Sequence, residues 1–435
     1  MRRPRPARPL TARTQARTRV RAAVAAALGS LVAALAPAPA AHSSEGQVPV
    51  GDVRRMVFVG NNWDGTVDVL RPGTLERVAR LDAVPDLDER MQEIATNPQR
   101  LAFFLAIREA IGEGNDQFVD DMYSSNDGRT LVISRPSFAD VVALDLRTGD
   151  IRWRFAVDGE RSDHMALSPD GKRVAVSAST GNVVHILRVA DGTEVAAVPS
   201  GGSPHENVYF DGGRKILHAS IGMVYSPLDQ PELDATKQER VFQVIDARTN
   251  RVVRRIDVRR SLDQAGLTRL SHAVRPLTLS PDERTVWFQV SFFHGFLQMD
   301  LRTGRITRVR RLPNLVPDLP REAYLLDSAH HGIAVDPTGR KLCVAGTMSD
   351  YATVVRRDDL TRGPLLKGGT KPYWVTPSAD GRFCYISWSG TDAVSQISYR
   401  TGRIAKTVRV GDHPQRIRNG FVAASLVRGL RSLGG

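Results

Sequence analysis

The sequence predicts an all-β fold of seven similar four-stranded units. The same kind of polar turn recurs along the chain, as in "SPDGKRVAVS" (168–177) and "SADGRFCYIS" (378–387). A short run of alternating apolar and polar residues follows each turn, which is the pattern of a half-buried strand. A second turn, such as "LDLRTGD" (144–150), then leads into a further strand. Four short antiparallel strands in units of about 40 residues are typical of a β-propeller blade.

We expect residues 1–40 to be a secretory signal peptide. They carry eight arginines, no acidic residue, an apolar run of fifteen residues and the small-x-small site Ala38-Pro39-Ala40. The apolar run is shorter than the about 20 residues of a membrane span, so cleavage is favoured over an uncleaved anchor. The mature chain is then secreted or extracytoplasmic, without a stable membrane span, and begins with a linker over 41–53.

The net charge and the two cysteines indicate which partners and cofactors are expected. Removing the eight arginines lowers the formal net charge from +13 to +5. The mature protein is therefore only mildly basic, which argues against a nucleic-acid partner. Cys343 and Cys384 fall near the start of comparable strands, about one repeat apart. Two buried free thiols are favoured over a disulfide. No Cys-x-x-Cys-His motif occurs, so covalently attached haem is not expected.

The order of the elements predicts how the ring closes. The innermost strands of the seven units are expected to begin near Asp121, His164, His205, Pro276, Gly332, Pro372 and His413. The last of these has no complete unit behind it, whereas the chain begins with three strands that lack a first. The C-terminal strand therefore completes the N-terminal blade, and the propeller spans 54–422 with a tail over 423–435.

The turns and the "LDLRTG"-type hairpins resemble those of the YVTN/YncE-like family of seven-bladed β-propellers, over roughly residues 54–422. The resemblance implies the fold. Propellers of this architecture include quinoprotein, cytochrome d1-type and lyase proteins of different chemistries, so the reaction has to be argued from the site.

Long insertions are expected on one face of the propeller. Residues 83–118 read as a short helical insertion with its core at 101–107, and Gly112 and Gly114 are stop signals. Further long connections cover 221–240, 258–274 and 312–329. Because strands alternate in direction, all four fall on the same face, where long loops are commonly functional. Lateral packing or a dimer contact is the alternative.

A ring of histidines is expected on that face, in a central funnel. His164, His205, His331 and His413 occupy equivalent positions at the starts of innermost strands. Neutral imidazoles that converge from different blades suit a transition metal, here Cu, Zn or Fe. Without a metal, His164 and His205 are candidate acid–base residues, with charge from Asp121 and Arg275. The alternative is that these groups only satisfy backbone hydrogen bonds.

Other side chains on the same face are expected to wall a ligand pocket. Aromatic rings around a few polar groups suit a small organic ligand. The candidates are Trp63, Arg135, Phe293, His294, Lys371, Tyr373 and Trp388.

The sequence leaves open whether the protein is an enzyme. One hypothesis is a metal-assisted lyase, hydrolase or oxidoreductase acting on a small molecule. The other is a non-catalytic propeller of the cell envelope that binds a ligand or an envelope protein.

Overall fold

The computed structural model describes residues 46–223, 231–324 and 328–432. The predicted signal peptide and the start of the linker lie outside the described residues, as do parts of the insertions 221–240 and 312–329 and the end of the tail. No helix within the described ranges is long and apolar enough to cross a membrane.

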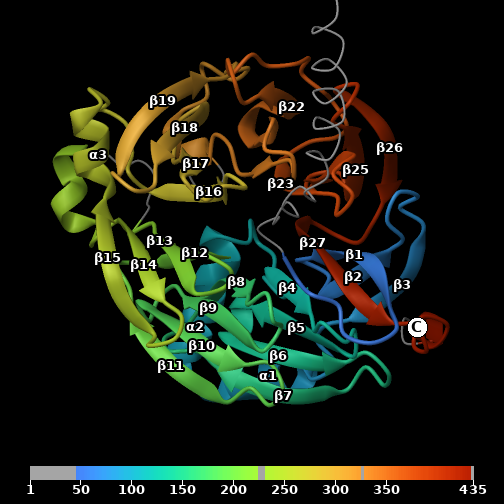
Figure 1. Ribbon diagram of the computed structural model, residues 1–435. Coiled ribbons are helices and arrows are strands. Elements are labelled where there is room, and N and C mark those ends of the chain that lie inside the picture. The colour runs from blue at the N-terminus through green and yellow to red at the C-terminus, as the bar shows by residue number, and fades with distance from the viewer. Residues whose placement is uncertain (1–45, 224–230, 325–327, 433–435) are drawn as a thin grey trace, which may run out of the picture. The chain divides into compact units, whose positions relative to one another are not determined.

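The strands of the described chain form seven antiparallel sheets, arranged as blades around a central axis (Figure 1). Ordered outward from the axis, four blades are β4 (Asp121–Ser124), β5 (Thr130–Arg135), β6 (Asp140–Asp145) and β7 (Ile151–Ala156); β8 (Ser162–Leu167), β9 (Arg173–Ala178), β10 (Val183–Arg188) and β11 (Glu194–Pro199); β12 (Pro204–Phe210), β13 (Lys215–Ser220), β14 (Val241–Asp246) and β15 (Arg251–Asp257); and β16 (Val274–Leu279), β17 (Thr285–Val290), β18 (Gly295–Asp300) and β19 (Arg305–Arg311). The other three are β20 (Ile333–Val335), β21 (Lys341–Gly346) and β22 (Tyr351–Arg356); β23 (Pro372–Pro377), β24 (Phe383–Trp388), β25 (Ala393–Ser398) and β26 (Arg403–Arg409); and β27 (Pro414–Ala423), β1 (Val53–Asn61), β2 (Thr66–Leu70) and β3 (Arg77–Asp82). The predicted seven-bladed propeller is confirmed.

One blade has an irregular outer edge. In the sheet β20–β21–β22, a segment takes the place of the fourth strand through backbone bonds between Ala352 and Leu366 and from the Gly363 N–H to the Val354 carbonyl. The position of the fourth strand is thus filled without a continuous ladder.

The two ends of the propeller meet in one blade. β27 pairs antiparallel with β1, in a register that runs from Val53 opposite Ala423 to Asn61 opposite Pro414. Figure 1 shows the red C-terminal strand beside the blue N-terminal strand. The C-terminal strand therefore supplies the innermost position that the first three strands lack, so that the edge of β1 that faces the axis is paired.

Side chains of the recurring turn determine where strands end and begin. The Ser168 hydroxyl donates to Asp170 Oδ1 (2.6 Å) and accepts the backbone N–H of Arg173 (3.0 Å), while Gly171 adopts the left-handed conformation with φ of 71°. The same contact to the first residues of a second strand is made by Ser125, Ser280 and Ser378. These serine hydroxyl bonds and the left-handed glycine explain why the recurring motif forms a turn.

The blades pack against one another through apolar side chains, and the disulfide lies between two of them. One such cluster joins β1–β3 to β4–β6, and another joins β12–β14 to β16–β18. Cys343 in β21 and Cys384 in β24 form a disulfide, with Cα atoms 6.4 Å apart. The expectation of two free thiols is therefore wrong. Cys343 is the third residue of β21 and Cys384 the second residue of β24, so the two side chains leave opposite faces of adjacent blades and meet between them.

The predicted helical insertion is present. It consists of α1 (Leu87–Thr96) and α2 (Pro98–Ala110), which are separated by Asn97. The Asn97 side chain accepts the N–H of Arg100 and caps α2. The other helical elements within the described residues are η1 (Pro136–Phe138), η2 (Pro231–Thr236), α3 (Val258–Gln264), η3 (Arg321–Ala323), η5 (Thr347–Ser349) and η6 (Gly429–Ser432).

Candidate metal centre

Ionisable side chains gather where the innermost strands begin. Bulges interrupt the ladder there: the register of β8 shifts between Ser162 and Met165, and that of β12 shifts between Pro204 and Glu206. A bulge leaves a residue outside regular pairing and re-aims its side chain, and bulges are common next to active sites. Asp163, His164 and His205 lie within these shifts.

These three residues form a group that fits one metal ion. Asp163, His164 and His205 each offer one ligand atom, and these atoms all lie within 4.8 Å of one another. The two imidazole centroids are 4.0 Å apart, and His164 Nε2 is 3.2 Å from Asp163 Oδ1. Every member is buried, with at most 4% of its surface exposed. Two imidazoles and one carboxylate are a donor set that suits Zn or Fe.

Burial keeps the histidines in the form that binds metals. It lowers the pKa of His164, His205 and His331 well below the usual 6.5. The guanidinium of Arg416, for His164 and His331, and that of Arg275, for His205, lower the pKa further. The imidazoles are therefore neutral near pH 7, as metal coordination requires.

A carboxyl group orients the central histidine. His164 Nδ1 lies 2.9 Å from Glu206 Oε2. The other imidazole nitrogen, Nε2, is the one that lies near Asp163. Metal-binding histidines commonly hold such a partner on the second nitrogen. Burial raises the pKa of Glu206 to about 8 and that of Asp120 to about 7, because an isolated carboxylate is poorly solvated there. A cation bound nearby would stabilise the charged form of both carboxyl groups and lower these pKa values.

The other two predicted metal ligands lie elsewhere in the ring. The His331 ring is 6.4 Å from that of His164 and 6.1 Å from that of His205, and it stacks on Tyr373 at 4.0 Å. His413 stacks on Trp63, with centroids 3.8 Å apart and planes 9° from parallel. The tight group therefore contains two of the four histidines.

The predicted charged partners border the same ring. Asp121 accepts two bonds from Arg418, at 2.9 and 2.7 Å, and also accepts the backbone N–H of Met165. Arg275 donates from Nε to Ser291 Oγ (3.0 Å). Asp121 is thus engaged in structural bonds, while the charge of Arg275 acts on the histidines.

The predicted ligand-binding residues divide into two sets. Trp63 and Tyr373 lie against ring histidines, as described above. The other five make contacts of their own: Arg135 bonds Asp140 and Asp86, Lys371 pairs with Glu113, His294 Nε2 is 3.0 Å from the Tyr324 hydroxyl, and Phe293 and Trp388 are buried in clusters between blades. The structure does not bring all seven together around one pocket.

Sequence reasoning missed several members of the cluster. Arg416 and Arg418 in β27, Trp374 in β23, and the acids Asp120 and Glu206 all lie in it and are buried. The signal was present in "DHPQRIRNG" (412–420), because an innermost strand with two arginines departs from the apolar pattern of a strand buried on both faces.

Comparison with known proteins supports the architecture. No family model matches the chain, and no curated protein matches it. Hydrazine synthase from Kuenenia stuttgartiensis is a structural match with a TM-score of 0.52 and 16% identity, which covers 68% of this chain and 88% of that chain. The match shows the fold. The resemblance to the YVTN/YncE-like family stays a prediction.

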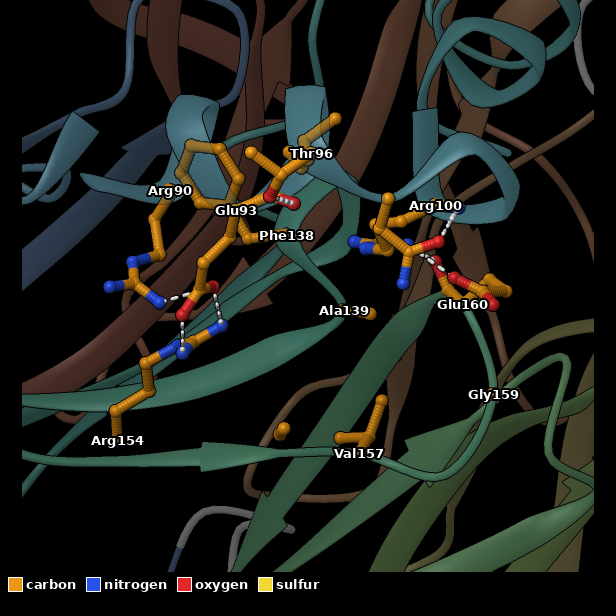
Figure 2. Close-up of a pocket in the computed structure, with 13 residues that line it drawn as sticks. Arg90, Glu93, Thr96, Arg100, Phe138, Ala139, Arg154, Val157, Gly159 and Glu160 are labelled. Carbon is orange, nitrogen blue, oxygen red and sulfur yellow. Dashed lines mark hydrogen bonds and ion pairs between the residues drawn. The ribbon is translucent and has the colours of Figure 1, made fainter. Parts of the chain in front are cut away.

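A separate cavity lies under the helical insertion and has its charges already paired. It measures about 480 Å³ and lies between α1–α2 and β7. Figure 2 shows Arg154 bonded to Glu93, and Arg100 bonded to Glu160. Since these arginines already have carboxylate partners, the contacts attach the insertion to its blade.

Proposed function

We propose that this protein is an exported, metal-assisted enzyme that acts on a small molecule. The observation that carries the proposal is the buried group of Asp163, His164 and His205, whose ligand atoms lie within 4.8 Å. Three protein ligands leave coordination positions for water or substrate. A metal bound there would polarise a substrate oxygen or lower the pKa of a bound water.

The surroundings support a reactive rather than a purely structural centre. Asp120 Oδ2 lies 3.8 Å from His164 Nε2 and has no hydrogen-bond partner among the described residues. An unpartnered buried carboxyl oxygen is costly unless a ligand, a metal or water satisfies it. Asp120 is therefore the residue placed to exchange a proton with a metal-bound molecule.

Export is part of the proposal. The disulfide between Cys343 and Cys384 supports it, because disulfides persist mainly in oxidising compartments. The expected signal peptide would direct the chain to the export machinery.

The test compares metal content in three proteins expressed as the full chain with its export segment. Wild type, His205→Ala and His413→Ala are purified, loaded in turn with Zn²⁺, Cu²⁺ and Fe²⁺, desalted and analysed by mass spectrometry. We expect about one ion per chain in wild type, loss in His205→Ala and retention in His413→Ala. His413 is the matched control, since it is a buried ring histidine outside the group. A wild-type protein that retains none of the three ions, or equal loss in both variants, would contradict the proposal.

The second candidate is a non-catalytic propeller that binds a ligand or an envelope protein. A cavity of about 680 Å³ favours it, because the basic side chains of Arg152, Lys172, Arg173 and Arg188 line it. Metal binding that requires His205 would favour the enzyme; a ligand whose binding requires Lys172 but not His205 would favour this candidate.

A further inference from the structure

The guanidinium of Arg416 is buried, and no described residue accepts a hydrogen bond from it. Its surface is 0% exposed, and none of its three guanidinium nitrogens has a hydrogen-bond partner among the described residues. The guanidinium lies over the Trp374 ring, 3.9 Å from the centroid. A cation–π contact satisfies the face of the guanidinium but not its N–H groups, which lie in its plane.

Other buried arginines of the propeller are treated differently. Arg135 is also 0% exposed, yet it bonds Asp140 at 2.8 Å and Asp86 at 2.5 Å. Arg418 makes its two bonds to Asp121. A buried guanidinium is expected to be paired and hydrogen-bonded in this way, because an unpaired buried charge costs several kcal/mol. Arg416 is the exception in need of a partner.

The nearest carboxylate does not fill that role. Arg416 Nη2 is 3.9 Å from Asp120 Oδ2, which is beyond hydrogen-bond distance. The same oxygen is 3.8 Å from His164 Nε2. Asp120 Oδ2 is therefore close to both Arg416 and His164 without a hydrogen bond to either, next to the group of Asp163, His164 and His205.

We propose that Arg416 binds a small carboxylate, which is the substrate or a substrate-like ligand of the centre. The inference rests on the proposed function and deepens it by naming the class of substrate. A carboxylate matches the planar fork of a guanidinium with two parallel bonds, and a carboxylate oxygen is also a ligand for a first-row metal. One few-atom anion can thus contact both Arg416 and a metal on His164.

A small cavity on the axis lies beside the cluster rather than at Arg416. It measures about 40 Å³ and is lined by all seven innermost strands, including Glu206 and Trp374, but Arg416, His164 and His205 are not among its lining residues. Formate is the probe of choice because it is the smallest carboxylate that still offers two oxygens to a guanidinium.

The experiment measures formate binding by calorimetry, at constant ionic strength with chloride as the reference anion. Wild type, Arg416→Met and Arg416→Lys are compared, each with and without bound metal. We expect saturable binding to wild type and at least tenfold weaker binding to Arg416→Met, since a charge-assisted bidentate contact is lost. Arg416→Lys keeps the charge but not the fork and should fall between them. The metal content should be equal in all three.

Thermal unfolding supplies a readout that a structural role would not produce. Formate should raise the Tm of wild type and leave that of Arg416→Met unchanged, because a ligand stabilises only the protein that binds it. Without formate, Arg416→Met should be at least as stable as wild type, because methionine removes a buried charge that lacks partners.

The outcomes separate this inference from the proposed function. A wild type that binds metal but not formate, or an Arg416→Met variant that binds formate as tightly as wild type, overturns the carboxylate site and leaves the metal centre standing. An Arg416→Met variant that is less stable than wild type and is restored by Arg416→Lys, together with a wild type whose Tm does not change with formate, shows a structural counter-ion and also overturns it. If formate binding depends on Arg416 but the wild type retains no metal ion, the carboxylate site is supported and the metal proposal fails.

Discussion

Acid should destabilise this protein through His218, a buried histidine of β13. Its side chain is 0% exposed. Nδ1 donates to Asn207 Oδ1 (2.8 Å), and Nε2 is 2.7 Å from Ser200 Oγ. Burial lowers the pKa of His218 to about 3. The folded protein therefore holds a neutral imidazole with both nitrogens satisfied, whereas the unfolded chain has the ordinary pKa of about 6.5.

The size and the sign of the effect follow from these two pKa values. Above pH 6.5 neither state takes up a proton at His218, so its contribution is fully present. As the pH falls through 6.5, the unfolded state gains a proton that the fold excludes, and stability is lost until about pH 3. At pH 5 the loss covers about 1.5 pH units at about 1.36 kcal/mol each, or about 2 kcal/mol.

The assay is urea unfolding of wild type and His218→Gln at pH 7.5 and pH 5.0, with chelator present, followed by tryptophan fluorescence. Glutamine can accept from Ser200 and donate to Asn207, but it does not titrate. The loss of unfolding free energy between the two pH values should be about 2 kcal/mol smaller in the variant. Other titrating groups cancel, since both proteins contain them. Equal losses in the two proteins would refute the reasoning.

Three further predictions concern contacts outside His218. Replacing Cys343 and Cys384 with alanine should lower the unfolding free energy by about 4 kcal/mol, from the 41-residue separation of the pair; denaturation with and without reductant measures this, and an effect of reductant on the variant as large as that on wild type would contradict it. Glu206→Gln should weaken metal binding about 10- to 100-fold, measured by competition with a chromophoric chelator; unchanged affinity would show that Glu206 does not orient its histidine. Arg135→Met should cost about 3–5 kcal/mol, because it breaks a buried ion pair, and should speed proteolysis within the insertion 83–118 without changing metal content. A variant that is as stable as wild type and whose insertion is not cut faster would show that the ion pairs of Arg135 are dispensable.

Much of the fold is predictable because its chemistry is local and repeated. The turn at Ser168 forms from side chains within five residues, so the sequence alone indicates where strands end and begin. The phase of these turns correctly placed His164 and His205 at the starts of innermost strands. The irregular fourth position beside β22 was not foreseen, since it depends on which bonds the neighbouring strand can offer.

The sequence by itself determined the repeat, the number of blades and the presence of histidines near the axis. Only the tertiary structure decided which groups meet there. Asp163 joins His164 and His205 because bulges turn consecutive side chains inward, and a shift of one residue in a strand sends a side chain to the opposite face. The pairing of Cys343 with Cys384, and the isolation of Arg416, likewise depend on how adjacent blades are spaced and rotated. Those distances arise from packing across the ring, between residues far apart in sequence, and no local pattern encodes them.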